Sequence, residues 1–244
     1  MKYAIPILIL ILLGCKKSED QSCFKSVGGL TTKEIELSSF NKIYMGPHLK
    51  YVLVQDTVEK VILHGGKNLL NFIETSIEGN QLSVRNKNKC NFLRDYDKVV
   101  TVEIHLKKII NILFEGTHEV LCPKTINTDY MTLVIRDGAG EVNLDINAYE
   151  LWTTVTYGWG NFNFVGDVNY LNVNLRSNGF GNAYNLNVND SLHVVSKTTE
   201  VLKVNANGCQ FTPQTFSAGD IWYIGTPTSI GFNAYGTGQL INKN

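Results

Sequence analysis

Charged side chains are scarce in this 244-residue sequence: they make up 18% of it, against about 25% in an average soluble domain. Basic and acidic residues both number 22, so neither sign is in excess. A neutral chain lacks the basic surface that nucleic-acid binding requires, and 43% apolar residues exclude a disordered chain. The polarity comes instead from asparagine, with 26 residues, while prolines number only five.

The sequence also lacks an apolar run long enough to cross a bilayer as a helix. Ala4–Leu13 has ten residues, whereas a membrane span needs about 20. Lys2 precedes this run, and Leu12-Leu13-Gly14-Cys15 closes it with a tetrad that resembles the lipobox of bacterial lipoproteins. We therefore predict a signal peptide over residues 1–14 and lipidation of Cys15. An ordinary signal peptide is the alternative.

Acyl chains on Cys15 would hold the mature chain to a membrane. Several chains give lasting attachment, because each buried CH₂ contributes roughly 0.8 kcal/mol. The polar residues that follow Cys15 predict a flexible tether over residues 15–36. The expected location is the bacterial cell envelope, as an outer-membrane lipoprotein, with the periplasmic and the external face both left open.

Four further cysteines could form disulfides in an exported chain: Cys23, Cys90, Cys122 and Cys209. They allow three pairings, and the sequence does not choose among them. None of them stands in a C-x-x-C pair, and no histidine follows at zinc-finger spacing. We therefore expect no metal site and no cofactor.

A Gly-x-Gly motif followed by a polar and then an apolar residue recurs along the chain. Its clear copies contain Gly138, Gly140, Gly158, Gly160, Gly179, Gly181, Gly236 and Gly238. With three degenerate copies, the motif repeats every 19 to 22 residues, and a fixed period in this range indicates a solenoid. Glycine suits such corners because it reaches positive φ and lets neighbouring backbones approach closely.

The residues between the corners alternate between apolar and polar, as in Val142-x-Leu144-x-Ile146. Such alternation indicates half-buried strands, two per repeat. The sequence thus predicts an all-β, parallel β-helix-like solenoid with coils of about 20 residues. It would fill one domain, 37–244, with regular repeats over 113–244. Residues 37–112 are strand-rich but less regular, and we expect them to begin and cap the same stack.

Several segments resemble the head GIN domain family of auto-transporter adhesins. They are Phe40-Asn41-Lys42-Ile43, Tyr51–Gln55, Asn68–Ile73, Gly79–Val84 and the corners that lead into Glu141-Val142, Asn161-Phe162 and Asp220-Ile221. The resemblance covers residues 40–244. It implies a right-handed parallel β-helix, similar in shape to pectin lyases but without their catalytic residues, and a role in adhesion. The chain departs from the family where Trp159 and Phe180 replace serine at the middle of the corner.

The sequence offers no clear catalytic set. Hydrolases and lyases on a β-helix need paired carboxylates or clustered acidic calcium ligands. The acidic residues of the repeats stand singly at corners: Glu119, Asp137, Glu141, Asp145, Asp167, Asp190, Glu200 and Asp220. No histidines pair at i+2 or i+4 spacing. We therefore expect no enzyme activity.

Tyr157, Trp159 and Phe180 lie at successive corners, and we take them as candidate ligand contacts. Aromatic rings on a solenoid edge can stack on sugars or anchor a protein. The alternative is that they fold over one another and close the edge. The function that fits best is a lipid-anchored binding or adhesion module of the cell envelope, with a glycan or protein on another surface as partner. A β-helix carbohydrate-active enzyme and a structural protein that forms homo-oligomers remain alternatives.

Overall fold

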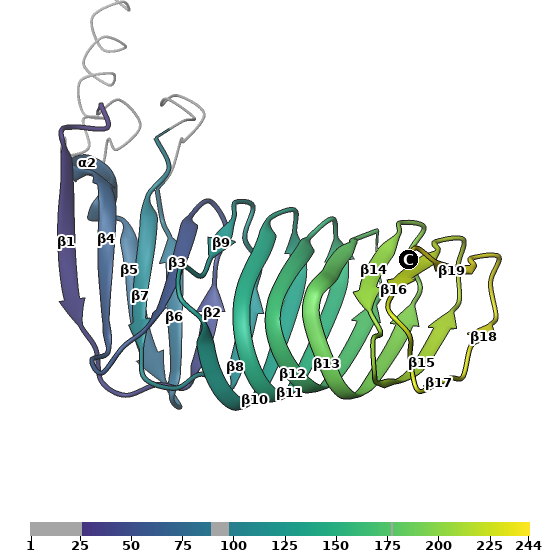
Figure 1. Cartoon of the computed structure of the whole chain (residues 1–244). Coiled ribbons are helices and arrows are strands. Elements are labelled where there is room, and N and C mark those ends of the chain that lie inside the picture. The colour runs from purple at the N-terminus through teal and green to yellow at the C-terminus, as the bar shows by residue number, and fades with distance from the viewer. Residues whose placement is uncertain (1–25, 89–97, 177) are drawn as a thin grey trace, which may run out of the picture.

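The computed structural model describes residues 26–88, 98–176 and 178–244 of the chain. The predicted signal peptide, Cys15, Cys23 and Cys90 lie outside these residues. The described chain forms a stack of coils that runs from an N-terminal end with antiparallel strands to the last coil near residue 242 (Figure 1). The predicted β-solenoid is confirmed.

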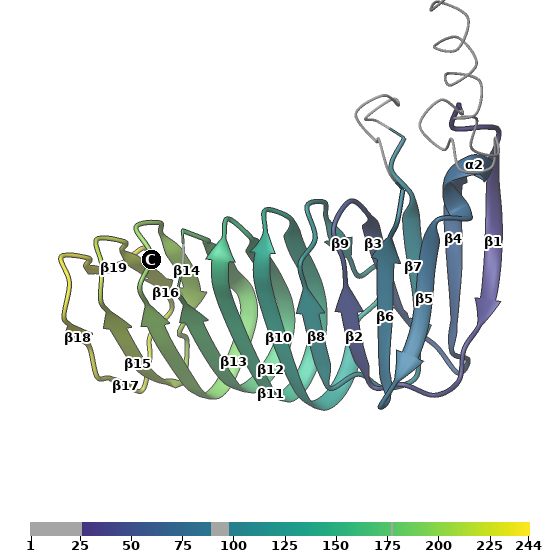
Figure 2. The same ribbon diagram turned by 180° about the vertical axis from the view of Figure 1, so that it is seen from behind.

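The coils are flattened between two parallel sheets, and the second sheet faces the viewer in Figure 2. In spatial order, the first sheet contains β7 (Thr101–Leu106), β3 (Lys50–Gln55), β9 (Val120–Leu121), the first halves of β11 (Glu141–Gly158), β12 (Asn161–Leu175) and β13 (Gly181–Ser196), then β14 (Leu202–Asn205), β16 (Ile221–Ile224) and β19 (Leu240–Asn242). The second contains β6 (Gln81–Asn86), β2 (Lys42–Met45), β8 (Asn111–Phe114), β10 (Ile126–Gly138), the second halves of β11, β12 and β13, then β15 (Gln210–Thr215) with β17 (Ser229–Ile230) and β18 (Asn233–Ala234).

Each coil lies in register on the next, so equivalent residues stack in columns. Leu133 pairs with Thr153, Thr153 with Val173, and Val173 with Val194, all in parallel. These side chains point inward and are buried, as the alternation predicted. We expected two strands per repeat, but β10, β11, β12 and β13 each run unbroken around the bend between the sheets. The coils on either side of these four, such as β8 with β9 and β14 with β15, have separate strands.

The corner glycines are required mainly by close approach to the preceding coil. A Cβ atom placed on any of the eight would lie 2.1 to 2.6 Å from another heavy atom, well inside contact distance. At Gly138 that atom is the carbonyl oxygen of Gly116. Positive φ, which we also expected at these corners, occurs only at Gly158 among the eight.

The N-terminal end of the stack departs from sequence order. Strand β2 lies between β6 and β8, and β3 lies between β7 and β9, so residues 42–55 are inserted between coils formed later in the chain. Strand β4 (Lys60–Gly66) adds to β7 in the antiparallel sense, and β5 (Ile73–Glu78) adds to β6 in the same way. The short helix α2 (Lys67–Leu70) joins β4 to β5.

Strand β1 (Leu30–Glu36) corrects the extent of the predicted tether. These residues were expected to be flexible, but they pair along their whole length with β4. The strand has no alternating apolar pattern because it is an edge strand, exposed except for partly buried Ile35. Main-chain hydrogen bonds, rather than side-chain burial, therefore place it, and the sequence pattern cannot report them.

The two cysteines in the described part of the chain, Cys122 and Cys209, are both free thiols. Cys209 is buried in the core, and this burial raises the pKa of its thiol to about 11. Within the same described ranges, none of the helical structure is long and apolar enough to cross a membrane.

Candidate functional site

The predicted aromatic residues project from the edge of the solenoid where the Gly-x-Gly corners stack, which we call the glycine edge. The exposed fractions of Tyr157, Trp159 and Phe180 are 69%, 61% and 44%. Trp159 and Phe180 occupy the middle position of corners in adjacent coils. Exposure of this size shows that the rings do not close the edge by folding over one another.

Two more aromatic residues extend the glycine edge toward the C-terminal coils. The rings of Phe216 and Tyr235 stack with centroids 4.6 Å apart, and the Lys197 ammonium lies 5.0 Å from the Phe216 centroid. Like Tyr157, both directly precede a corner. Our sequence analysis missed Phe216 because its corner has lost a glycine. The aromatic residue that directly precedes its corner, as Tyr157 and Tyr235 precede theirs, was the signal that could have found it.

The backbone under Tyr157 adopts an uncommon conformation. Its φ is +53°, in the left-handed region that residues other than glycine rarely occupy. Asp137, at the same place in the preceding coil, has a φ of +57°. The Trp159 amide then donates a hydrogen bond of 2.9 Å to the Gly138 carbonyl oxygen, which ties the two corners together. Contacts with the adjacent coil therefore hold in place the backbone that carries the aromatic side chains.

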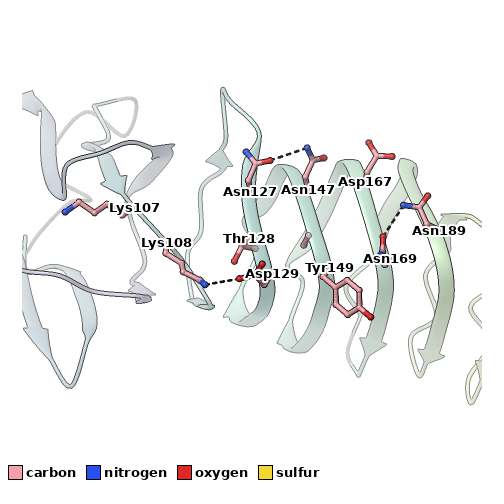
Figure 3. A pocket seen from close by; sticks show the side chains of 11 residues that line it. Lys107, Lys108, Asn127, Thr128, Asp129, Asn147, Tyr149, Asp167, Asn169 and Asn189 are labelled. Atoms are coloured by element: carbon pink, nitrogen blue, oxygen red, sulfur yellow. Dashed lines mark hydrogen bonds and ion pairs between the residues drawn. The ribbon is translucent and has the colours of Figure 1, made fainter.

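A groove of about 590 Å³ lies at the opposite bend, where the first sheet passes into the second, and runs over four successive coils. Figure 3 shows its side chains in two rows, Asn127, Asn147 and Asp167 in one, and Asp129, Tyr149, Asn169 and Asn189 in the other. We call it the amide groove. No sequence motif singled out these residues, because they come together only where the bends of successive coils align.

Comparison with known proteins places the chain in a family. A family model described as "Putative auto-transporter adhesin, head GIN domain" matches residues 39–227. The chain belongs to this family. The resemblance seen in the sequence is thus confirmed. No curated protein sequence gives a significant match.

Solved structures share the fold of this head GIN domain. A putative adhesin from Bacteroides fragilis has a TM-score of 0.79 and 22% identity, over 88% of this chain and 97% of that one. A putative lipid binding protein from Parabacteroides distasonis has a TM-score of 0.65 and 17% identity, over 89% and 98%. A putative adhesin from Parabacteroides merdae has a TM-score of 0.56 and 18% identity, over 90% and 98%.

The acidic residues that we considered for catalysis in this head GIN domain have structural partners where the contacts are defined. Glu141 lies in register with Asn161 on the next coil, so an acid faces an amide. Four other acids have partners in the described chain: Glu119 with Lys50, Asp137 with Arg136, Asp167 with Asn187, and Asp220 with the Gln239 amide. These contacts give the five acids structural partners.

One cluster of titratable groups was missed, because its members come from β4, from β7 and from the residue that follows β3. The His105 ring lies between two carboxylates, with Nδ1 2.8 Å from Asp56 and Nε2 2.8 Å from Glu103. Glu103 also contacts His64 Nε2 at 3.0 Å. Since both nitrogens of His105 face carboxylates, the ring is held within a hydrogen-bonded network.

The network shifts the pKa values of its two acids. The hydrogen bond from His105 lowers the pKa of Asp56. Burial alone would raise the pKa of Glu103, but hydrogen bonds from His105 and His64 outweigh it and the pKa falls. In the part of the chain that the structure describes, no group of three histidine, cysteine or acidic side chains could hold a metal ion.

Proposed function

We propose that this head GIN domain is a non-catalytic binding module, held to the bacterial outer membrane by acyl chains on Cys15. It uses the glycine edge to contact a glycan or a protein on another surface. Membership of a family named for adhesins supports a binding role. The expected absence of a catalytic pair is a further reason to prefer binding over polysaccharide cleavage.

The observation that carries this proposal is the exposure of Tyr157, Trp159 and Phe180 on a backbone fixed by stacked corners. An exposed aromatic ring offers a large apolar contact with few rotatable bonds, so little entropy is lost when it binds. Rings on neighbouring coils multiply that contact along one line. The pattern of the family favours serine where this chain has Trp159 and Phe180.

A triple variant tests the edge: Tyr157→Ser, Trp159→Ser and Phe180→Ser in the full mature chain, solubilised in detergent. An array of glycans and immobilised extracellular proteins supplies the probes. We expect the triple variant to lose binding to the array ligand by about a hundredfold, since each buried aromatic contributes on the order of 1 kcal/mol. The matched control is Trp152→Ser, which removes a tryptophan with 45% exposure from the face of the second sheet. Unchanged binding by a folded triple variant would exclude the edge as the contact surface.

The anchor is tested separately in cells. Metabolic labelling with a radioactive fatty acid should mark the wild-type chain and should not mark Cys15→Ala. Protease treatment of intact cells then reports which face carries the domain: loss of the wild-type chain indicates the external face, and survival the periplasmic face. Labelling of the Cys15→Ala chain at the wild-type level would refute the lipid anchor.

A further inference from the structure

The amide groove combines an elongated shape with side chains suited to sugar hydroxyls. It is open to solvent and follows the stacking direction of the coils rather than entering the core. Amides dominate its two rows, and each carries two N–H donors and one carbonyl acceptor. A sugar ring likewise presents alternating donors and acceptors around its rim, so the two chemistries match.

The amides are held in place and still have capacity to bind. Asn147 donates to Asn127 at 3.4 Å, and Asn189 donates to Asn169 at 3.3 Å. Each such bond uses one N–H of the donor and one lone pair of the acceptor, so every amide retains at least one further N–H. Because each amide is oriented by its neighbour on the next coil, little side-chain entropy is lost when a ligand binds.

The spacing of the groove suits a repeating ligand. Neighbouring strands stack about 4.8 Å apart, so each row presents one polar side chain at this interval. An extended, linear glycan advances along its axis by about one such spacing per sugar unit. Successive sugars can therefore meet equivalent polar side chains on the successive coils that line the groove.

Tyr149 supplies a surface for stacking at the centre of the groove. Its side chain is 57% exposed, and its ring meets the Tyr170 ring in a T-shaped contact with centroids 5.3 Å apart. The contact with Tyr170 fixes the orientation of the ring while leaving much of its surface in solvent. An aromatic platform beside hydrogen-bonding amides is the combination that recognises both the apolar face and the hydroxyl rim of a sugar.

Both lysines of the groove are paired with an acid. Lys108 pairs with Asp129 at 3.0 Å, and Lys107 pairs with Glu59 at 3.5 Å. The remaining acid, Asp167, accepts a hydrogen bond of 2.9 Å from Asn187. These groups leave one net negative charge, which does not attract an anionic polymer, and an uncharged ligand avoids the cost of displacing these ion pairs.

We infer that the amide groove binds a linear, uncharged glycan, with Tyr149 stacking on one sugar and the amides holding the hydroxyls of its neighbours. This site is separate from the glycine edge and does not depend on the function proposed for that edge. The two surfaces lie at different bends of the same coils, so one domain could contact two ligands at once.

Titration calorimetry on the full mature chain in detergent tests the inference. The probes are hexasaccharides of β-1,4-glucan, β-1,3-glucan, β-1,4-mannan and α-1,4-glucan, with a hexamer of galacturonate as the anionic counterpart. At least one neutral hexamer should bind. Tyr149→Ala and Asn169→Ala should each weaken its binding by about tenfold, the loss expected for one stacked ring or one group of hydrogen bonds. Asn172→Ala, on the outer face of the second sheet, is the matched control and should bind as the wild type does.

Each other outcome overturns the inference. Failure of every neutral hexamer to bind, or tighter binding of the galacturonate hexamer, would show that the groove does not hold an uncharged glycan. Unchanged affinity in folded Tyr149→Ala and Asn169→Ala variants would place the ligand elsewhere. If instead the triple variant of the glycine edge lost the hexamer and the groove variants kept it, the glycan would belong to the edge, which would support the proposed function and remove this one.

Discussion

The regular coils and the N-terminal end are stabilised by contacts of different range. In the coils, Val142 pairs with Phe162, twenty residues on, and every later coil repeats that step with small variation. At the N-terminal end, Ile43 pairs with Ile112, and Tyr51 meets Val120. The coils therefore form by adding neighbours, whereas the end must close long loops, which costs more chain entropy.

The two regions also use glycine differently. At the corners, glycine is needed because a Cβ would collide with the preceding coil. In the hairpin between β5 and β6, Gly79 and Asn80 both have positive φ, at +54° and +63°, and a Cβ on Gly79 would meet open space. That pair of angles is the type I′ turn that joins two antiparallel strands. The first requirement is tertiary and the second is local.

The largest expected effect comes from breaking the contact between coils. Gly138→Ala would place a Cβ 2.1 Å from the Gly116 carbonyl oxygen, so the stack must separate locally, and we expect a loss of about 3 kcal/mol in the free energy of unfolding. Urea denaturation followed by circular dichroism measures it.

The control for that substitution is Gly231→Ala, also in the solenoid, whose Cβ would have only Thr212 Cγ2 nearby, at 3.7 Å. It should change stability by less than about 0.5 kcal/mol. Equal losses in the two variants would show that close approach to the preceding coil is not what requires glycine at position 138.

A smaller effect, on stability in acid, should distinguish the N-terminal end from the regular coils. Asp56 and Glu103 have pKa values below their ordinary range, so the stability they provide is complete above that range. This stability is lost as the pH falls from about 4, the ordinary pKa of these carboxyl groups, through their lowered pKa values. We expect amide hydrogen exchange in β4 and β7 to accelerate in this acid range before exchange in β11 and β12 does.

His105→Gln should weaken that selective response to acid, because a glutamine side chain has no second ring nitrogen with which to contact Asp56 and Glu103 at the same time. His193→Gln is the matched control, since His193 contacts the Thr212 hydroxyl at 2.9 Å on the coils and no carboxylate. If acid opened the coils and the N-terminal end together in the wild type, the network would have no local role.

The smallest effect concerns the glycine edge. Tyr157→Asn replaces a residue that is strained at positive φ with one that tolerates the left-handed region, so the protein should gain about 0.5 to 1 kcal/mol. Thermal unfolding measures the gain. Under the proposed function, the same variant should bind its array ligand more weakly. If the strain at Tyr157 is retained for binding, stability should therefore rise while affinity falls.

Much of the fold could be predicted because short-range patterns in the sequence specify its repeating unit. The interval of the corners and the alternation of residues such as Val142 and Leu144 report a half-buried strand whose partner is one coil away. The aromatic edge was predictable for the same reason, since Trp159 and Phe180 occupy equivalent positions. Phe216 escaped because its corner is degenerate, and β1 escaped because an edge strand buries little.

By itself, then, the sequence determined the period, the coil corners and the inward faces of the strands, since those depend on contacts that recur every twenty residues. Only the tertiary structure decided that residues 42–55 are inserted between later coils, that His105 joins Asp56 and Glu103, and that the bends align into an amide groove. Those arrangements join residues at unrelated separations, and hydrogen bonding and packing across such distances leave no periodic trace in the chain.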